Sequence, residues 1–237
     1  KFTKNNLTYL IYYFVRQNEP KIPIYFLPGL AANSSIFKNI QLDPDKFDVH
    51  FLEWMIPFEE ESISEYAQRF CSKVLRPNAV LVGVSFGGII AQEMILVHDF
   101  RKIIIISSVK TRHELPLHLQ LAGKTKVYKL LPTSFFAQNI DLLSKYAFGK
   151  PIVDRLKLYK QYLSITDKRY LDWAIKQVVS WDQEESDPNL IHIHGNKDIV
   201  FPIDNIKRCV LVEGGTHIMI LNKYKWLNEN LPKLIFS

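Results

Sequence analysis

Residues 80–90 read VLVGVSFGGII, and this stretch indicates the fold class most strongly. A run of β-forming residues leads to Ser85, which stands between Gly83 and Gly87, and an apolar helical pattern follows. A Gly-x-Ser-x-Gly pentapeptide in this setting is typical of a sharp strand-to-helix turn that exposes the serine. The glycines permit close approach of neighbouring backbone, and the helix directs its N-terminal N–H groups at whatever Ser85 attacks. This placement disfavours the alternative, a glycine-rich turn without chemistry.

Composition indicates a globular chain with one sizeable core. The 237 residues are 47% hydrophobic and 23% charged, which is too apolar for disorder. The net charge is +6, but the 30 Lys and Arg are scattered, whereas a nucleic-acid-binding arm would concentrate them. The apolar run 7–15 is too short to span a bilayer and is predicted to be a strand. We therefore expect no nucleic-acid partner and no stable membrane insertion.

The cysteines favour a reducing compartment. Cys71 and Cys209 lie in different predicted elements and do not make a disulfide framework. A cytoplasmic protein is the simpler expectation, because disulfides persist in oxidising compartments. Residue 1 is Lys rather than Met, so removal of an upstream targeting segment stays open. The sequence does not indicate an oligomeric state.

Apolar runs and helical periodicities alternate along the chain and predict an α/β fold. Expected strands are 22–27, 47–53, 79–84, 102–107, 189–194 and 207–212, and expected helices are 62–75, 86–98 and 217–230. The all-apolar run 103–106 suits a strand buried on both faces of a parallel sheet. Ser62 and Glu65 match a capping box at the start of the first of these helices.

The alternation stops between residues 111 and 181. This block is aromatic and rich in lysine, with helices expected at 117–131, 134–148, 151–164 and 168–179. A helical block inserted between strands is typical of a lid over the edge where the strands end, and the alternative is an extra outer layer. We expect a core made of 1–110 and 182–237, with 111–181 as an inserted helical cap.

A serine hydroxyl is a poor nucleophile at neutral pH and needs a neighbouring base that a third group orients. In α/β proteins such a triad follows the order serine, acid, histidine. Two downstream strands end suitably, one in GNKD at 195–198 and one in EGGTH at 213–217. Asp198 and His217 then lie beyond the carboxyl ends of strands, at the edge where Ser85 emerges.

Three segments in this order resemble the signatures of the α/β-hydrolase superfamily. They are 83–87, 194–198 with Pro202, and 214–217. The resemblance covers nearly the whole chain except 111–181, where members carry variable caps. It implies a mostly parallel central sheet flanked by helices. It also implies Ser85 as nucleophile, His217 as general base and then acid, and Asp198 as the group that orients His217.

Rival assignments exist for the acid and for the histidines. Asp204 is the alternative acid, although the Gly-x-x-Asp-x-x-x-Pro spacing favours Asp198. His192 and His194 alternate on one strand face and could hold a metal, but no acidic or Cys ligand pattern accompanies them, so no metal is expected. The other histidines without a motif are His50, His98, His113 and His118.

The resemblance implies an oxyanion hole made of backbone N–H groups. One donor is Phe86, directly after the nucleophile, and the other is Leu30, with Ala31 as second candidate. Pro28 stands where the family commonly has histidine, which leaves open how this loop is held. The link between Asp198 and His217 is also short, because a parallel crossover usually contains a full helix.

The resemblance implies hydrolysis of a carboxylic ester or related acyl compound through an acyl-serine, without metal or organic cofactor. Haloalkane dehalogenase and epoxide hydrolase chemistry needs an aspartate at the position of Ser85. Thioesterase, lactonase and acyltransferase chemistry stay open, as do a ligand-binding protein with little turnover and a partner-binding domain. We expect a small-to-medium apolar acyl substrate, and the predicted contact residues are Leu30, Phe86, Phe135, Phe136 and Trp173.

Overall fold

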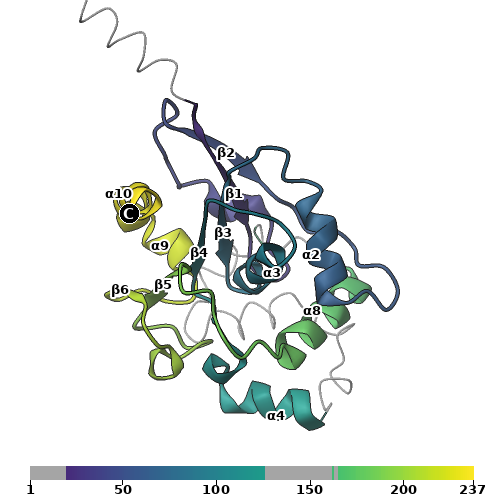
Figure 1. Cartoon of the computed structure of the whole chain (residues 1–237). Helices are drawn as coiled ribbons and strands as arrows, with labels where there is room; N and C mark the ends of the chain where they lie inside the picture. The colour runs from purple at the N-terminus through teal and green to yellow at the C-terminus, as the bar shows by residue number, and fades with distance from the viewer. Residues whose placement is uncertain (1–19, 126–161, 163–164) are drawn as a thin grey trace, which may run out of the picture.

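The computed structural model describes residues 20–125, 162 and 165–237 (Figure 1). The expected strand 7–15 and the expected helix 134–148 lie outside the described residues, as do Phe135 and Phe136. The expected helix 151–164 falls there too, except for Tyr162.

A parallel sheet forms the centre of the described chain (Figure 1). Its six strands are β1 (Ile22–Leu27), β2 (Phe47–Phe51), β3 (Val80–Val84), β4 (Lys102–Ile106), β5 (Ile191–Gly195) and β6 (Val210–Val212). Every neighbouring pair is parallel, in the order β2-β1-β3-β4-β5-β6. The chain moves outward from β1 to β2 and then returns to β3 on the other side. The order therefore reverses between β1 and β3, where open α/β sheets bind ligands.

The central strands are buried on both faces, as their apolar sequences predicted. All five residues of β3 are buried, and so is the run Ile103–Ile106 of β4. The edge strand β2 is less buried: Phe47 lies in the core, but Phe51 is 48% exposed. This difference follows from the layers, because only the middle strands carry helices over both faces.

Helices flank the sheet (Figure 1). They are α2 (Ile63–Cys71), α3 (Phe86–Ile95), α4 (Leu117–Thr125), α8 (Lys168–Ser180), α9 (Met219–Asn222) and α10 (Tyr224–Phe236). Short 3-10 turns are η1 (Ser34–Phe37), η2 (Arg112–Glu114) and η4 (Ile203–Asn205). The capping box at Ser62 and Glu65 is present as predicted. In the part of the chain that is described, no helix combines the length and the apolarity that crossing a membrane requires.

Two predicted elements differ near the C-terminus. The strand expected from residue 207 begins only at Val210, because the Lys207 N–H bonds to the Glu114 carboxylate and Arg208 takes a left-handed φ of 51°. The expected helix 217–230 is divided into α9 and α10, and α10 continues to Phe236. The short crossover between β5 and β6 contains only η4 in place of a full helix.

The described part of the inserted block packs closely on the core. The helices α4 and α8 cross tightly, since a Cβ on Gly123 would lie 2.0 Å from the carbonyl oxygen of Val179. The side of α8 that faces the core carries Tyr170, whose hydroxyl accepts the Ala31 N–H, and Trp173, whose ring lies 6.0 Å from that of Phe86. The helix α8 therefore contacts the loops at the carboxyl ends of β1 and β3.

Candidate active site

The serine lies on a strained turn between β3 and α3. Ser85 has φ 53° and ψ −120°, a conformation that costs a non-glycine residue about 1–3 kcal/mol. Larger residues at Gly83 and Gly87 would clash with neighbouring backbone. A Cβ on Gly83 would lie 2.3 Å from the Gly87 carbonyl oxygen, and a Cβ on Gly87 would lie 2.4 Å from the Pro28 carbonyl oxygen. The Ser108 hydroxyl donates to the carbonyl oxygen of Ser85 at 2.7 Å and helps hold the turn.

Three predicted side chains meet at this turn. His217 Nε2 lies 2.9 Å from Ser85 Oγ, and His217 Nδ1 lies 2.9 Å from Asp198 Oδ2. The residues follow β3, β5 and β6, so the common edge of the parallel strands brings them together. The carboxylate beside His217 is that of Asp198, whereas Asp204, the alternative acid, lies in η4.

The environment of Asp198 keeps it ionised. Its Oδ1 accepts the N–H groups of Val200 at 2.9 Å and Phe201 at 3.0 Å. Burial by itself raises the pKa of this carboxyl, but the charge and hydrogen bond of His217 and the Phe201 N–H outweigh it, so the pKa lies below its ordinary value. An ionised carboxylate only accepts, so Nδ1 of His217 carries the proton and Nε2 is free to take one from Ser85.

Two buried histidines support the loop that carries Asp198. His194 Nε2 lies 2.9 Å from the carbonyl oxygen of Phe201, and His192 Nε2 lies 3.1 Å from His194 Nδ1. A carbonyl only accepts, so His194 donates from Nε2 and accepts from His192 at Nδ1. Burial lowers the pKa of both imidazoles. Among the described residues, no cluster of three or more His, Cys, Asp or Glu could hold a metal.

The loop after β1 passes beside the serine. An ideal Cβ on Gly29 would lie 3.5 Å from the Cβ of Ser85. The Ala31 N–H points to the hydroxyl of Tyr170 at 3.4 Å, which leaves Leu30 as the better candidate for an oxyanion donor. The indole N–H of Trp54 donates to the Gly29 carbonyl oxygen at 2.9 Å. Nothing in the local sequence around Trp54 or Tyr170 indicated these contacts.

The predicted substrate contacts differ in their surroundings. Leu30 is half-buried, whereas Phe86 is 1% and Trp173 is 7% exposed. The indole of Trp173 donates to the Glu61 carbonyl oxygen at 2.7 Å, and its ring lies 4.2 Å from that of Tyr66. Both aromatic side chains therefore already have protein neighbours.

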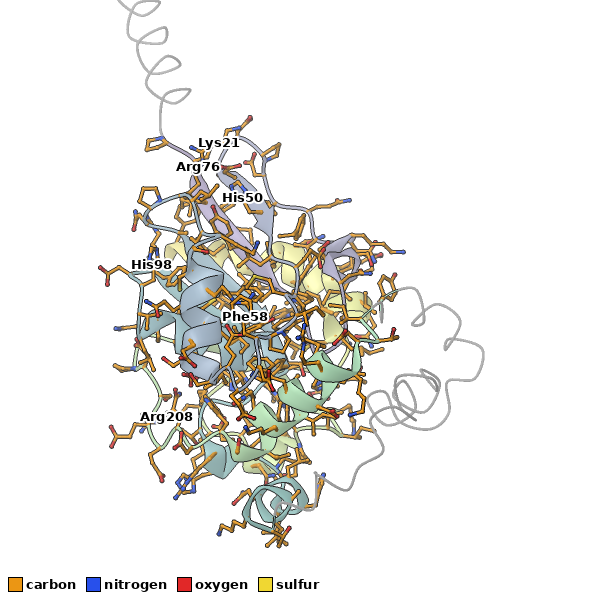
Figure 2. All side chains as sticks on the ribbon, turned by 90° about the vertical axis from the view of Figure 1, so that its right-hand side faces the viewer. Lys21, His50, Phe58, Arg76, His98 and Arg208 are labelled. Carbon is orange, nitrogen blue, oxygen red and sulfur yellow. The ribbon has the colours of Figure 1, made fainter. Side chains whose placement is uncertain are left out.

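The histidines without a motif lie elsewhere. His50, in β2, stacks on Tyr25 with ring centroids 4.6 Å apart, and His98 packs edge-on against Phe100. Figure 2 labels His50 and also Lys21, which comes directly before β1, whereas His50 pairs with Tyr25 further along that strand. Ser85 lies after the opposite, carboxyl end of β3.

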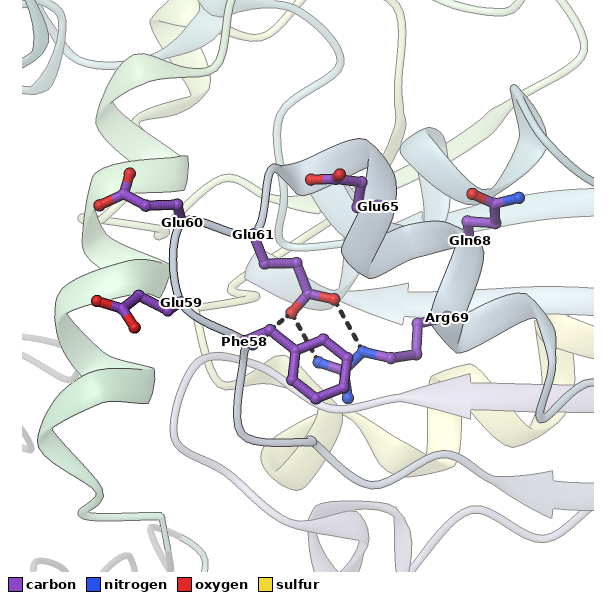
Figure 3. A pocket seen from close by; sticks show the side chains of 7 residues that line it. All are labelled: Phe58, Glu59, Glu60, Glu61, Glu65, Gln68 and Arg69. Carbon is purple, nitrogen blue, oxygen red and sulfur yellow. Dashed lines mark hydrogen bonds and ion pairs between the residues drawn. The ribbon is translucent and has the colours of Figure 1, made fainter.

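A pocket of about 550 Å³ lies before and along α2 (Figure 3). It is lined by Phe58, Glu59, Glu60, Glu61, Glu65, Gln68 and Arg69. Its buried carboxylate, Glu61, is paired with Arg69 at 2.7 Å, and that guanidinium lies 4.2 Å from the Phe58 ring. The pocket contains none of the three residues that meet at the β3 turn.

Solved structures resemble this chain along nearly its whole length. An enol-lactonase from Burkholderia xenovorans has a TM-score of 0.67 at 13% identity, covering 93% of this chain and 94% of that chain. MenH from S. aureus has a TM-score of 0.65 at 16% identity, covering 92% and 95%. A thermophilic esterase from Thermogutta terrifontis has a TM-score of 0.63 at 13% identity, covering 91% of each chain.

No protein-family model and no curated protein matches the sequence. The structural likenesses show that the chain has the α/β-hydrolase fold, which the three ordered motifs predicted.

Proposed function

We propose that the protein is a serine hydrolase that cleaves a carboxylic ester or related acyl compound through an acyl-serine intermediate. One observation carries this proposal: the His217 imidazole bridges Ser85 Oγ and the Asp198 carboxylate, with 2.9 Å on each side. A hydroxyl, a base and an orienting acid in this relation are what nucleophilic acyl transfer requires.

The proposed reaction runs in two steps. Ser85 Oγ bonds to the acyl carbon while its proton passes to His217 Nε2, and the carbon–oxygen bond of the ester breaks as the leaving alcohol takes that proton. Water then attacks the acyl-serine, with His217 as base and then acid, and releases the carboxylic acid and Ser85. Asp198 stabilises the imidazolium in both steps. The Phe86 and Leu30 N–H groups would bind the oxyanion.

We also propose that 111–181 is a cap over this site and that the substrate is a small-to-medium apolar acyl compound. Contacts of α8 with the loops after β1 and β3 support the cap. Among the similar structures are an enol-lactonase and an esterase, and both names denote acyl–oxygen chemistry. Thioesterase and acyltransferase chemistry need the same triad.

A cytoplasmic location is consistent with the thiols. Cys71 and Cys209 are both free and half-buried. Burial raises the pKa of the Cys71 thiol to about 11 and that of Cys209 in the same direction, so neither is an activated nucleophile.

Hydrolysis of p-nitrophenyl butyrate by the wild type and by Ser85→Ala tests the proposal. We expect the variant to lose at least about 10³-fold in rate, because the nucleophile is gone. Ser72→Ala is the matched control, since Ser72 is exposed after the end of α2. A fluorophosphonate should label Ser85 of the wild type. Equal rates for wild type and Ser85→Ala would refute the hydrolase, and ligand-induced thermal stabilisation without product would favour a binding protein.

A further inference from the structure

Trp54 contacts both sides of the place where an oxyanion would form. Its indole N–H donates to the Gly29 carbonyl oxygen at 2.9 Å, one residue before Leu30. Its ring stacks on that of Phe86, with centroids 5.2 Å apart and planes 22° apart. The two proposed donors, Leu30 and Phe86, belong to loops after different strands, and Trp54 comes from a third segment, after β2.

The bond to Gly29 fixes the direction of the Leu30 N–H. The Gly29 C=O and the Leu30 N–H belong to one planar trans peptide, so they point in opposite directions and turn together. The Ala32 N–H donates to the same carbonyl oxygen at 3.1 Å, so two donors hold it. A rotation that moved the Leu30 N–H would break both bonds, and the indole bond is buried.

The indole itself is held by an aromatic cluster. The rings around Trp54 are Tyr66 at 6.5 Å, Phe70 at 5.7 Å and Tyr170 at 5.6 Å. Trp54 is 8% exposed, so its ring cannot swing into solvent. The same Tyr170 accepts the Ala31 N–H, which fixes the next peptide of the loop as well.

We propose that Trp54 is a positioning residue for the oxyanion site, which holds the Leu30 N–H through Gly29 and the Phe86 peptide through ring stacking. This inference rests on the proposed function. It also gives the loop a support that Pro28 cannot supply from its own side chain, since proline carries no polar side-chain group.

A purely structural role for Trp54 makes a different prediction. If the indole only fills the core, removing its N–H changes stability but not turnover by each folded molecule. If it orients the Leu30 N–H, turnover falls while substrate affinity is kept, because the oxyanion exists only in the transition state.

The experiment compares kcat and KM for p-nitrophenyl butyrate after active-site titration with a fluorophosphonate. Trp54→Phe keeps a ring and loses the N–H, and Trp54→3-benzothienylalanine replaces only the N–H by sulfur in a side chain of nearly unchanged size. We expect kcat to fall about 10- to 100-fold with KM within about twofold, the scale of a misplaced catalytic group.

Trp181→Phe is the matched control. The Trp181 indole is also buried and donates to Glu93 Oε1 at 2.7 Å, at a place outside the proposed site, so its kcat should match the wild type. Unchanged kcat in any Trp54 variant that folds would overturn the inference. If Trp54→Phe does not fold, the 3-benzothienylalanine variant decides the question. Absence of Ser85-dependent turnover in the wild type would instead overturn the proposed function.

Discussion

The buried carboxylate of Glu114 accepts the backbone N–H of Lys207 at 3.0 Å, although 93 positions separate the two residues. Its other oxygen accepts the Lys110 N–H at 2.7 Å, and the Lys110 ammonium lies 3.3 Å from Glu114. That ammonium also donates to the Arg208 carbonyl oxygen at 3.0 Å. These contacts hold the short crossover between Asp198 and His217 against the loop after β4. The crossover itself contains only the turn η4.

Glu114→Ala should destabilise the protein by about 3–5 kcal/mol, because it removes the counter-ion of the buried Lys110 ammonium and the acceptor of the Lys110 and Lys207 N–H groups. Urea unfolding followed by circular dichroism measures the change. Glu229→Ala is the control: its pair with Lys233 is exposed, so the loss should stay below about 0.5 kcal/mol. Similar losses for the two variants would show that the Glu114 contacts do not stabilise the fold.

Asp198→Asn should lower kcat about 10³- to 10⁴-fold and leave the fold intact. An amide at this position donates as readily as it accepts, so the tautomer of His217 that leaves Nε2 free for Ser85 is no longer enforced. Steady-state kinetics on p-nitrophenyl butyrate measure this loss. Asp204→Asn serves as the control and should retain wild-type kcat. A larger loss in Asp204→Asn than in Asp198→Asn would move the acid to η4.

Gly87→Ala should reduce both stability and turnover. The added Cβ would lie 2.4 Å from the Pro28 carbonyl oxygen and 2.7 Å from that of Leu27, so the loop that carries Leu30 has to move. Overpacking of this kind costs about 1–3 kcal/mol. Thermal unfolding and kcat together measure the effect. Gly29→Ala is a stability control, since its Cβ meets only ordinary contacts at 3.5 Å. An unaffected Gly87→Ala would contradict the close approach at this turn.

Acid should destabilise the protein through His192 and His194. Burial lowers the pKa of both imidazoles in the folded protein. In the unfolded chain these two histidines take up protons near the ordinary pKa of about 6.5, whereas in the folded protein they stay neutral at that pH. Stability from this source is therefore present above that value and falls as the pH drops below it.

Unfolding free energies measured in urea between pH 7.5 and 5 test this histidine effect. His192→Asn should show a smaller loss on acidification than the wild type, because one buried proton acceptor is gone. His98→Asn removes a part-exposed histidine outside this pair and is measured alongside as the matched substitution. Equal slopes for wild type and His192→Asn would exclude His192 as a source of the acid sensitivity.

Elements whose signals are local could be predicted from the amino-acid sequence without coordinates. The turn around Ser85 follows from glycines within two positions, and the capping box at Ser62 and Glu65 spans a single helical turn. The parallel sheet follows from apolar runs such as Ile103–Ile106, because a strand without a polar face must be covered on both sides. Each of the three motifs follows a predicted parallel strand, so the sequence also predicted that Ser85, Asp198 and His217 lie at one edge of the sheet.

The contacts that hold those residues in place became visible only in the folded chain. The Trp54 bond to Gly29, the Glu114 bond to Lys207 and the His194 bond to Phe201 each end on a backbone group. Every residue but proline offers the same backbone N–H and C=O, so no residue type reveals which of them a distant side chain will reach. Such pairings are set by how the loops pack once the sheet has formed, and the local sequence carries no sign of them.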